Sequence, residues 1–238
     1  MPANRDKKRD PHASLALLWG ERDQPRRGPK PKLTVAELTG QGIAIADAEG
    51  LDAVSMQRLA EAVGVTTMAL YRYIPGKSDL VDLMADAVFV DPPTVTGIPG
   101  GWRPQLAAWS RACWDRYREH PWLLAAIGMR RQAMGPHQVA WLDAALAALA
   151  PTGLSAKQQH DAVILILGHI RSVTQQLLDH DEAGSQEWDR LTADLLDRNS
   201  ERFPALTRAV AAGAFAPTDD DPLDFGLTCI LDGVAALM

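Results

Sequence analysis

Two helix-start signals lie close together in the first third of the chain, and they restrict the fold more than any other feature. Ser55 and Thr66 each precede a short helical pattern, and their hydroxyl groups can accept a hydrogen bond from the first turn of a helix. Gly64 ends the first pattern, and Pro75-Gly76 ends the second. The sequence therefore predicts two short helices joined by a tight turn over residues 55–74.

Small and apolar residues occur in this pair where two crossing helices have to touch. Ala60 allows close approach, Gly64 permits the turn, and Leu70 points back toward the first helix. This spacing is typical of a helix-turn-helix, which places the N-terminus of its second helix in the major groove of DNA. A packed helical hairpin without DNA binding is the alternative interpretation. The remaining contacts between the two helices are expected from Leu59, Val63, Val65 and Tyr73.

The helical period that buries Leu70 leaves the other side of the second helix exposed. Thr66 and the helix N-terminus can bind a phosphate through backbone N–H groups, whereas Thr67 and Met68 are placed to touch base edges. Arg72 can reach guanine or phosphate, and the neighbouring tyrosines and lysine are expected to contact phosphates. The DNA contacts predicted from this region are Ser55, Thr66, Thr67, Met68, Ala69, Tyr71, Arg72, Tyr73 and Lys77.

Charge is distributed unevenly along the chain, although the net charge is -6. Residues 1–32 form a basic N-terminal extension with nine lysines and arginines and four carboxylates. Two prolines and a glycine near its end exclude a helix there, so Arg27, Lys30 and Lys32 are expected to follow the DNA backbone or enter the minor groove. The apolar run around Leu15 has two open interpretations, a short helix packed on the body or disorder. From residue 179 onward, thirteen carboxylates against four arginines disfavour DNA contact.

Helical patterns dominate the rest of the sequence, so we expect an all-α fold. A capping box from Thr34 to Glu37 begins a helix that stops at Gly50, and another helix runs from 77 to about 90. A segment rich in proline and glycine follows and predicts a boundary between a DNA-binding domain over 33–90 and a helical domain over 100–238. Helices in the second domain are expected at about 102–119, 121–128, 136–150, 155–180, 186–202 and 221–237.

Composition and motifs exclude several other classes of protein. The two cysteines lie in apolar helical patterns, and no run is long enough to span a membrane, so a cytoplasmic protein is expected. The pair His160-Asp161 has no partner at the spacing of a zinc protease, and neither a GxSxG sequence nor a phosphate-binding loop occurs. We therefore expect neither an enzyme, nor a metal site, nor a cofactor. The alternative to a DNA-binding regulator is a helical protein-interaction module without sequence-specific DNA binding.

The run from Leu59 to Val65, the run from Ala69 to Ile74, and Lys77 followed by Leu80 resemble helices 2 to 4 of the tetracycline-repressor (TetR) family. Later segments are similar to the C-terminal domain of the branch that includes the tetracycline repressors. The resemblance covers residues 30–238 and is strongest over 33–85. The later segments are Trp102-Arg103, His120-Pro121-Trp122, Gly135-Pro136, Gly153-Leu154-Ser155, Asp224 to Leu227 and Leu231 to Val234.

This resemblance implies an all-helical homodimer in which each subunit has a DNA-binding head and a pocket for a small molecule. Ligand binding would change the separation of the heads and release a palindromic DNA operator. Membership of this family would favour a repressor over an activator. The helices near 155–180 and 221–237 would form a four-helix bundle between subunits. The run from Val163 to Leu167 is apolar on every side of the helix, as expected for a helix that other helices cover on both sides.

Pocket residues are predicted in two ways. Aromatic, sulfur-containing and histidine side chains of the second domain suit a small apolar ligand; these are Trp109, Met129, Met134, Trp141 and His169, with Trp114 also considered. Alignment with the family adds Cys113, Ile127, Leu142, Leu146 and Val163. Core packing is the alternative for each apolar residue, and a core or interface position is the alternative for the histidine.

One departure from the family pattern concerns the nature of the ligand. Tetracycline repressors hold a drug-bound magnesium ion with a histidine and a glutamate, and these positions correspond here to Ile127 and Gln176. Neither side chain supplies the imidazole or carboxylate that those positions require. We therefore expect an organic, fairly apolar small molecule in place of a tetracycline–magnesium complex.

Overall fold

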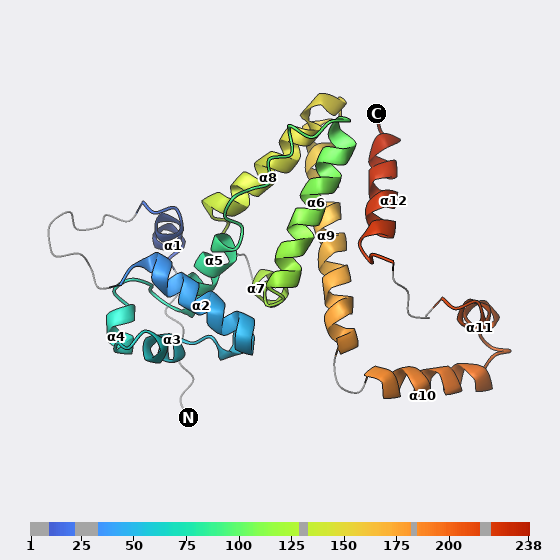
Figure 1. Ribbon diagram of the computed structural model, residues 1–238, viewed down its shortest axis with the longest axis horizontal. Helices are drawn as coiled ribbons and strands as arrows, with labels where there is room; N and C mark the ends of the chain where they lie inside the picture. Colours follow the sequence, from blue (N-terminus) through green and yellow to red (C-terminus); the bar gives the residue numbers. More distant parts are fainter. Residues whose placement is uncertain (1–9, 22–32, 129–132, 182–184, 215–219) are drawn as a thin grey trace.

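The computed structural model describes the chain except for residues 1–9, 22–32, 129–132, 182–184 and 215–219 (Figure 1). The described residues form α-helices and two short 3₁₀ turns but no strand, so the prediction of an all-α fold is confirmed. The helices are α1 (Pro11–Leu18), α2 (Val35–Glu49), α3 (Met56–Ala62), α4 (Thr67–Leu70), α5 (Lys77–Ala87), α6 (Trp102–Glu119), α7 (Leu123–Gly128), α8 (Pro136–Leu149), α9 (Ala156–Asp181), α10 (Ser185–Arg198), α11 (Pro204–Ala211) and α12 (Asp224–Ala235). None of these helices is long and apolar enough to cross a membrane.

Helices α2 to α5 pack around a common core at one end of the molecule (Figure 1). The predicted capping box begins α2, since the backbone N–H of Glu37 donates to the Thr34 hydroxyl at 3.1 Å and the backbone N–H of Thr34 donates to the Glu37 carboxylate at 2.7 Å. A Cβ atom at Gly42 would lie 2.8 Å from the sulfur of Met84. Glycine at this position therefore lets α2 lie directly against α5.

The segment before α2 also forms a helix, which decides between the two interpretations of the run around Leu15. Asp10 caps α1 by accepting a hydrogen bond from the backbone of His12 at 3.0 Å. Leu17 and Leu18 are buried, and the Ser14 hydroxyl donates to Asp79 of α5 at 2.5 Å. An extra short helix is thus packed on the DNA-binding end of the molecule.

The second half of the molecule is built on three long helices that lie side by side. Helix α6 packs against α8 and α9, and α9 packs against α12 (Figure 1). Gly226 is required for the last contact, since a Cβ atom there would lie 2.2 Å from the His169 ring. Helices α5, α7 and α8 meet where the two halves join.

Helices α10 and α11 extend away from this body beyond the end of α9 (Figure 1). Helix α11 was not predicted from the sequence, although Pro204 lies at the start of this helix, a position where proline is favoured. Its apolar residues are exposed, as Leu206 and Val210 illustrate. No described residue of this chain therefore covers the apolar side of α11.

Candidate DNA-binding surface and ligand cavity

The helix-turn-helix is held together by its own caps and by a small core. Ser55 accepts a hydrogen bond from the backbone of Arg58 at 3.0 Å and begins α3, and Thr66 accepts one from Ala69 at 3.3 Å and begins α4. Gly64 has a φ of +69°, a conformation that glycine adopts without strain. Leu70 is completely buried. The short polar sequence therefore forms a defined turn between two packed helices.

The predicted DNA contacts gather on and around α4. Met68 is 77% exposed, and Thr66, Tyr71 and Arg72 are exposed as well. The half-buried members of the set are Ser55, Thr67, Ala69, Tyr73 and Lys77. These side chains can offer hydroxyl groups, a thioether and an aromatic face to DNA, together with the guanidinium of Arg72.

Some positively charged side chains on this surface already make hydrogen bonds within the protein. Arg58 on α3 pairs with Glu49 of α2 at 2.7 Å, and this hydrogen bond raises the pKa of its guanidinium. The Lys77 ammonium donates to the Leu51 carbonyl at 3.4 Å. The predicted contacts Arg27, Lys30 and Lys32 lie outside the described residues. Among the described residues of α4 and its flanks, Arg72 is therefore the clearest cation available to a phosphate.

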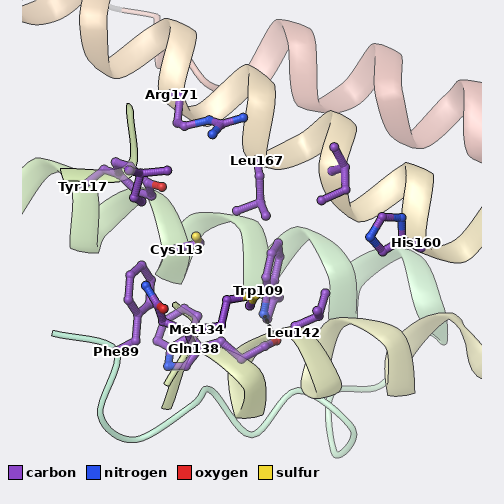
Figure 2. A pocket seen from close by; sticks show the side chains of 13 residues that line it. Phe89, Trp109, Cys113, Tyr117, Met134, Gln138, Leu142, His160, Leu167 and Arg171 are labelled. Carbon is purple, nitrogen blue, oxygen red and sulfur yellow. Dashed lines mark hydrogen bonds between the residues drawn. The ribbon is translucent and has the colours of Figure 1, made fainter. Parts of the chain in front are cut away.

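A cavity of about 250 Å³ lies between α6, α8 and α9 (Figure 2). Trp109 and Cys113 of α6, Gln138 of α8 and Leu167 of α9 surround it. Aromatic and aliphatic groups predominate, as in most sites for small organic molecules. The complete lining is Phe89, Trp109, Cys113, Tyr117, Ile127, Met134, Gln138, Trp141, Leu142, His160, Ile164, Leu167 and Arg171.

The predicted pocket residues fall into three groups. Leu146, Val163 and His169 are not part of the cavity lining, and Met129 lies outside the described residues. The His169 ring nitrogen Nε2 instead donates to the Leu223 carbonyl at 3.1 Å and so links α9 to the segment before α12. The remaining predicted residues line the cavity: Trp109, Cys113, Ile127, Met134, Trp141 and Leu142.

Most of the lining residues that were not predicted from the sequence lie three or four positions from a predicted one on the same helix, or on the side of α9 that faces the cavity. Tyr117 follows Cys113 by four residues, and Gln138 precedes Trp141 by three, so each pair shares a side of its helix. Phe89 lies just after α5, and no local signal points to it. On α9, the side facing the cavity carries His160, Ile164, Leu167 and Arg171.

The aromatic groups of the cavity wall are fixed by one another. The Phe89 ring meets the Trp141 ring edge-on, with centroids 5.2 Å apart. The Trp109 indole donates to the Trp141 carbonyl at 2.8 Å. These contacts give the cavity a defined shape before any ligand enters.

The ionisation of the lining residues restricts the charge of a ligand. Burial raises the pKa of the Cys113 thiol to about 12, and burial also raises the pKa of Tyr117. Both groups are therefore neutral near pH 7. The described lining includes no carboxylate but does include Arg171, so a neutral or anionic ligand fits better than a cation.

One buried carboxylate connects the cavity to the DNA-binding end. Asp86 of α5 accepts hydrogen bonds from the backbone N–H groups of Gln138 at 2.9 Å and His137 at 3.4 Å, at the start of α8. Burial raises the pKa of this carboxyl. A Cβ atom at Gly135 would lie 2.2 Å from the Asp86 carboxylate. The N-terminal end of α8, which carries cavity residues, is thus tied directly to α5.

A second connection joins α2 to the corner between α6 and α7. One oxygen of Asp47 accepts from the His120 ring at 2.7 Å and from the Trp122 indole at 2.6 Å. A third connection runs from α1, because the Trp19 indole donates to the Met134 carbonyl at 3.2 Å. All three link the helix-turn-helix end to segments that adjoin or line the cavity.

No group of three or more histidine, cysteine or carboxylate side chains that could hold a metal ion occurs within the described part of the chain. The cavity instead combines aromatic walls with a few polar atoms. The fold and the exposed α4 together define a helix-turn-helix protein that binds DNA and regulates transcription.

Comparison with known proteins agrees with this class. Residues 41–84 match the family model of bacterial regulatory proteins of the tetR family, and residues 97–238 match that of the tetracyclin repressor-like C-terminal domain. The chain therefore belongs to the TetR family of transcriptional regulators, as the sequence analysis predicted.

A repressor and two solved structures illustrate the similarity. The chain is 37% identical over 235 residues to the HTH-type transcriptional repressor DrrR1 of Streptomyces coeruleorubidus, a match that covers 94% of this chain and 86% of that protein. Apo ActR from Streptomyces coelicolor is 26% identical with a TM-score of 0.74, covering 87% of this chain and 97% of that one. ActR in complex with actinorhodin is 25% identical with a TM-score of 0.73, covering 86% and 96%.

Proposed function

We propose that this regulator is a homodimeric repressor that leaves a palindromic operator when a small organic ligand enters the cavity between α6, α8 and α9. The observation that carries the proposal is the pair of hydrogen bonds that backbone N–H groups at the start of α8 donate to the Asp86 carboxylate. They connect a wall of the cavity to α5, which packs against α2 in the DNA-binding core. A ligand that moves α8 can therefore move α5.

The relatives support both repression of transcription and the binding of a small organic ligand. DrrR1 is a transcriptional repressor, and ActR has been crystallised with actinorhodin bound. In this chain the cavity has aromatic walls and no carboxylate among its described lining residues. These properties suit an organic molecule of low polarity.

Exposed apolar residues on α9 and α12 support the homodimer. Leu165 on α9 is 57% exposed, and Phe225 on α12 is 83% exposed. Burying such residues against a second copy removes apolar surface from water. In the proposed dimer, α9 and α12 of the two subunits pack as a four-helix bundle, and residues 100–238 form the ligand-binding and dimerisation domain.

The DNA-binding domain comprises residues 33–90 in this proposal. Thr67 and Met68 read base edges, while Tyr71, Tyr73 and Lys77 contact phosphates. Arg27, Lys30 and Lys32 of the 1–32 extension supply charge for the operator backbone. The protein acts in the cytoplasm and has no catalytic activity.

Selection of operator sequences from random DNA, followed by band shifts, tests the proposal. The full-length protein should enrich a palindromic site, and actinorhodin and related aromatic compounds should be screened for release of that DNA. Sedimentation at micromolar protein concentration should give a dimer. Absence of any enriched sequence would favour a helical interaction module and contradict the proposal.

A further inference from the structure

Helix α1 and the residue that follows it contact both the DNA-binding end and the wall of the cavity. The eight residues of α1 pack against α5, and the indole of Trp19, directly after the last turn, donates to the Met134 carbonyl at 3.2 Å. Met134 also lines the cavity. The family matches cover residues 41–84 and 97–238, so a helix outside both matches touches both functional regions.

The turn that ends α1 fixes the position of Trp19. Gly20 has a φ of +67°, and the backbone N–H of Glu21 donates to the Ala16 carbonyl at 2.8 Å. The backbone N–H of Gly20 donates to the Leu17 carbonyl at 3.2 Å, which completes a Schellman motif. Because this motif ties Trp19 to the last turn of α1, the residue moves together with the helix.

The other end of this connection is the first turn of α5. The Ser14 hydroxyl donates to Asp79 at 2.5 Å, and both side chains are buried. Asp79 lies two residues after Lys77, a predicted phosphate contact, in the first turn of α5. A buried hydrogen bond is costly to break. A displacement of this turn when DNA binds is therefore passed on to Ser14.

We propose that α1 transmits conformational changes between the DNA-binding surface and the ligand cavity. It does so through Ser14 at the α5 end and through Trp19 at the cavity end. The two hydrogen bonds act in series, because both side chains belong to one short helix and its closing turn. This route is additional to the one through Asp86.

The proposal rests on the proposed function in taking this cavity as the ligand site. Coupling between two binding sites is reciprocal, so a ligand that affects DNA binding through α1 implies that DNA affects the cavity through α1. The effect of DNA on Met134 can therefore be measured without any small molecule.

Methyl signals of two methionines in the NMR spectrum of the full-length protein provide the test. The protein contains methionine labelled with ¹³C in the methyl group, and signals are assigned from Met68→Leu and Met134→Leu. Met68 is 77% exposed on α4 and reports DNA binding itself, whereas Met134 reports the state of the cavity wall. Selected operator DNA should displace both signals in the wild-type protein.

Two variants each remove one of the hydrogen bonds. Ser14→Ala leaves Trp19 beside Met134, so its effect on the Met134 signal has to pass through α1; Trp19→Phe removes the indole donor directly. Each should reduce the DNA-induced displacement of the Met134 signal about threefold, and the double variant should reduce it no further, because links in series are not additive. The Met68 signal should still move in all of them. His12→Ala, at an exposed position of α1, is the control and should behave like the wild type.

Three results would overturn the proposal: a Met134 signal that does not move when DNA binds to the wild-type protein, an undiminished displacement in Ser14→Ala, or a greater loss in the double variant than in either single one. Thermal unfolding of each variant shows whether the fold persists. A displaced Met134 signal without operator release by any ligand contradicts the proposed function alone. Operator release by a ligand together with an unmoved Met134 signal contradicts this inference alone.

Discussion

The DNA-binding surface and the ligand cavity differ in how far apart their residues lie in the chain. The described contacts of the surface fall between Ser55 and Lys77, whereas the cavity is lined by residues from Phe89 to Arg171. The surface is shaped by its own caps and turn. The cavity has a shape only after α6, α8 and α9 have packed, so a change there should affect the rest of the molecule more widely.

The largest expected effect comes from removing one buried leucine in each region. Leu70 and Leu106 are both completely buried, and replacing either by alanine should lower the free energy of unfolding by about 3 kcal/mol. Leu70→Ala should abolish operator binding and leave ligand binding intact, whereas Leu106→Ala on α6 should weaken both. Urea unfolding, band shifts and fluorescence titration measure the three quantities. Loss of ligand binding in Leu70→Ala would contradict the view that the DNA-binding surface is shaped by its own caps and turn, independently of the cavity.

A glycine substitution probes the connection between the two regions. In Gly135→Ala the new methyl group meets the Asp86 carboxylate, and separating the start of α8 from α5 should lower the free energy of unfolding by about 2 kcal/mol. Gly97→Ala is the control, because no atom lies within 4 Å of a Cβ there, and its effect should stay below about 0.5 kcal/mol. Operator release by a bound ligand should be impaired only in Gly135→Ala. Equal melting temperatures of the two variants would contradict the close contact between the start of α8 and Asp86 of α5.

Two substitutions on α4 and its flank separate affinity from specificity. Tyr71→Ala should weaken binding to all DNA sequences by about 1 kcal/mol, since a phosphate contact carries no sequence information. Met68→Ala should change the preferred base at one position of each half-site and weaken binding to other sequences little. Quantitative band shifts on the selected operator and its single-base variants measure both. The assignment fails if both variants bind every one of these DNAs like the wild type.

The smallest expected effect is a change in the pH dependence of stability. Burial raises the pKa of Asp86 above its ordinary value of 3.8, so the folded protein binds a proton that the unfolded chain releases. The contribution of Asp86 to stability therefore decreases as the pH rises from about 4 through its folded pKa. Asp86→Asn does not titrate, so its stability relative to the wild type should increase over that range. Urea unfolding from pH 4 to 7 measures the difference, and a constant difference would contradict the shift.

The same contrast explains what could be predicted from the sequence. Ser55, Gly64 and Thr66 act on their own neighbours, so their positions indicated the helix-turn-helix directly. On α6, Trp109 was predicted from its aromatic side chain and Cys113 from the resemblance to the family, and both line the cavity.

Other features depend on how helices are turned against each other. Val163 and His169 lie on α9, but the side of α9 that faces the cavity carries Ile164 and Leu167. The rotation of a helix about its axis follows from packing, and an apolar run such as 163–167 does not specify it. Helix α11 was missed for a related reason, since its apolar residues have no partner among the described residues of the chain.

The hydrogen bonds of Asp47 and Asp86 have a consequence for chimeric regulators. Asp47 lies within the segment that matches the DNA-binding family model, its partners His120 and Trp122 lie within the C-terminal match, and Asp86 lies between the two. A head grafted from another family member up to the end of this match brings its own residue to position 47 and can leave the His120 imidazole and the Trp122 indole without their carboxylate, but Asp86 then still comes from this chain. A functional graft onto this sensor must therefore carry an aspartate at position 47, and its crossover point must lie before residue 86.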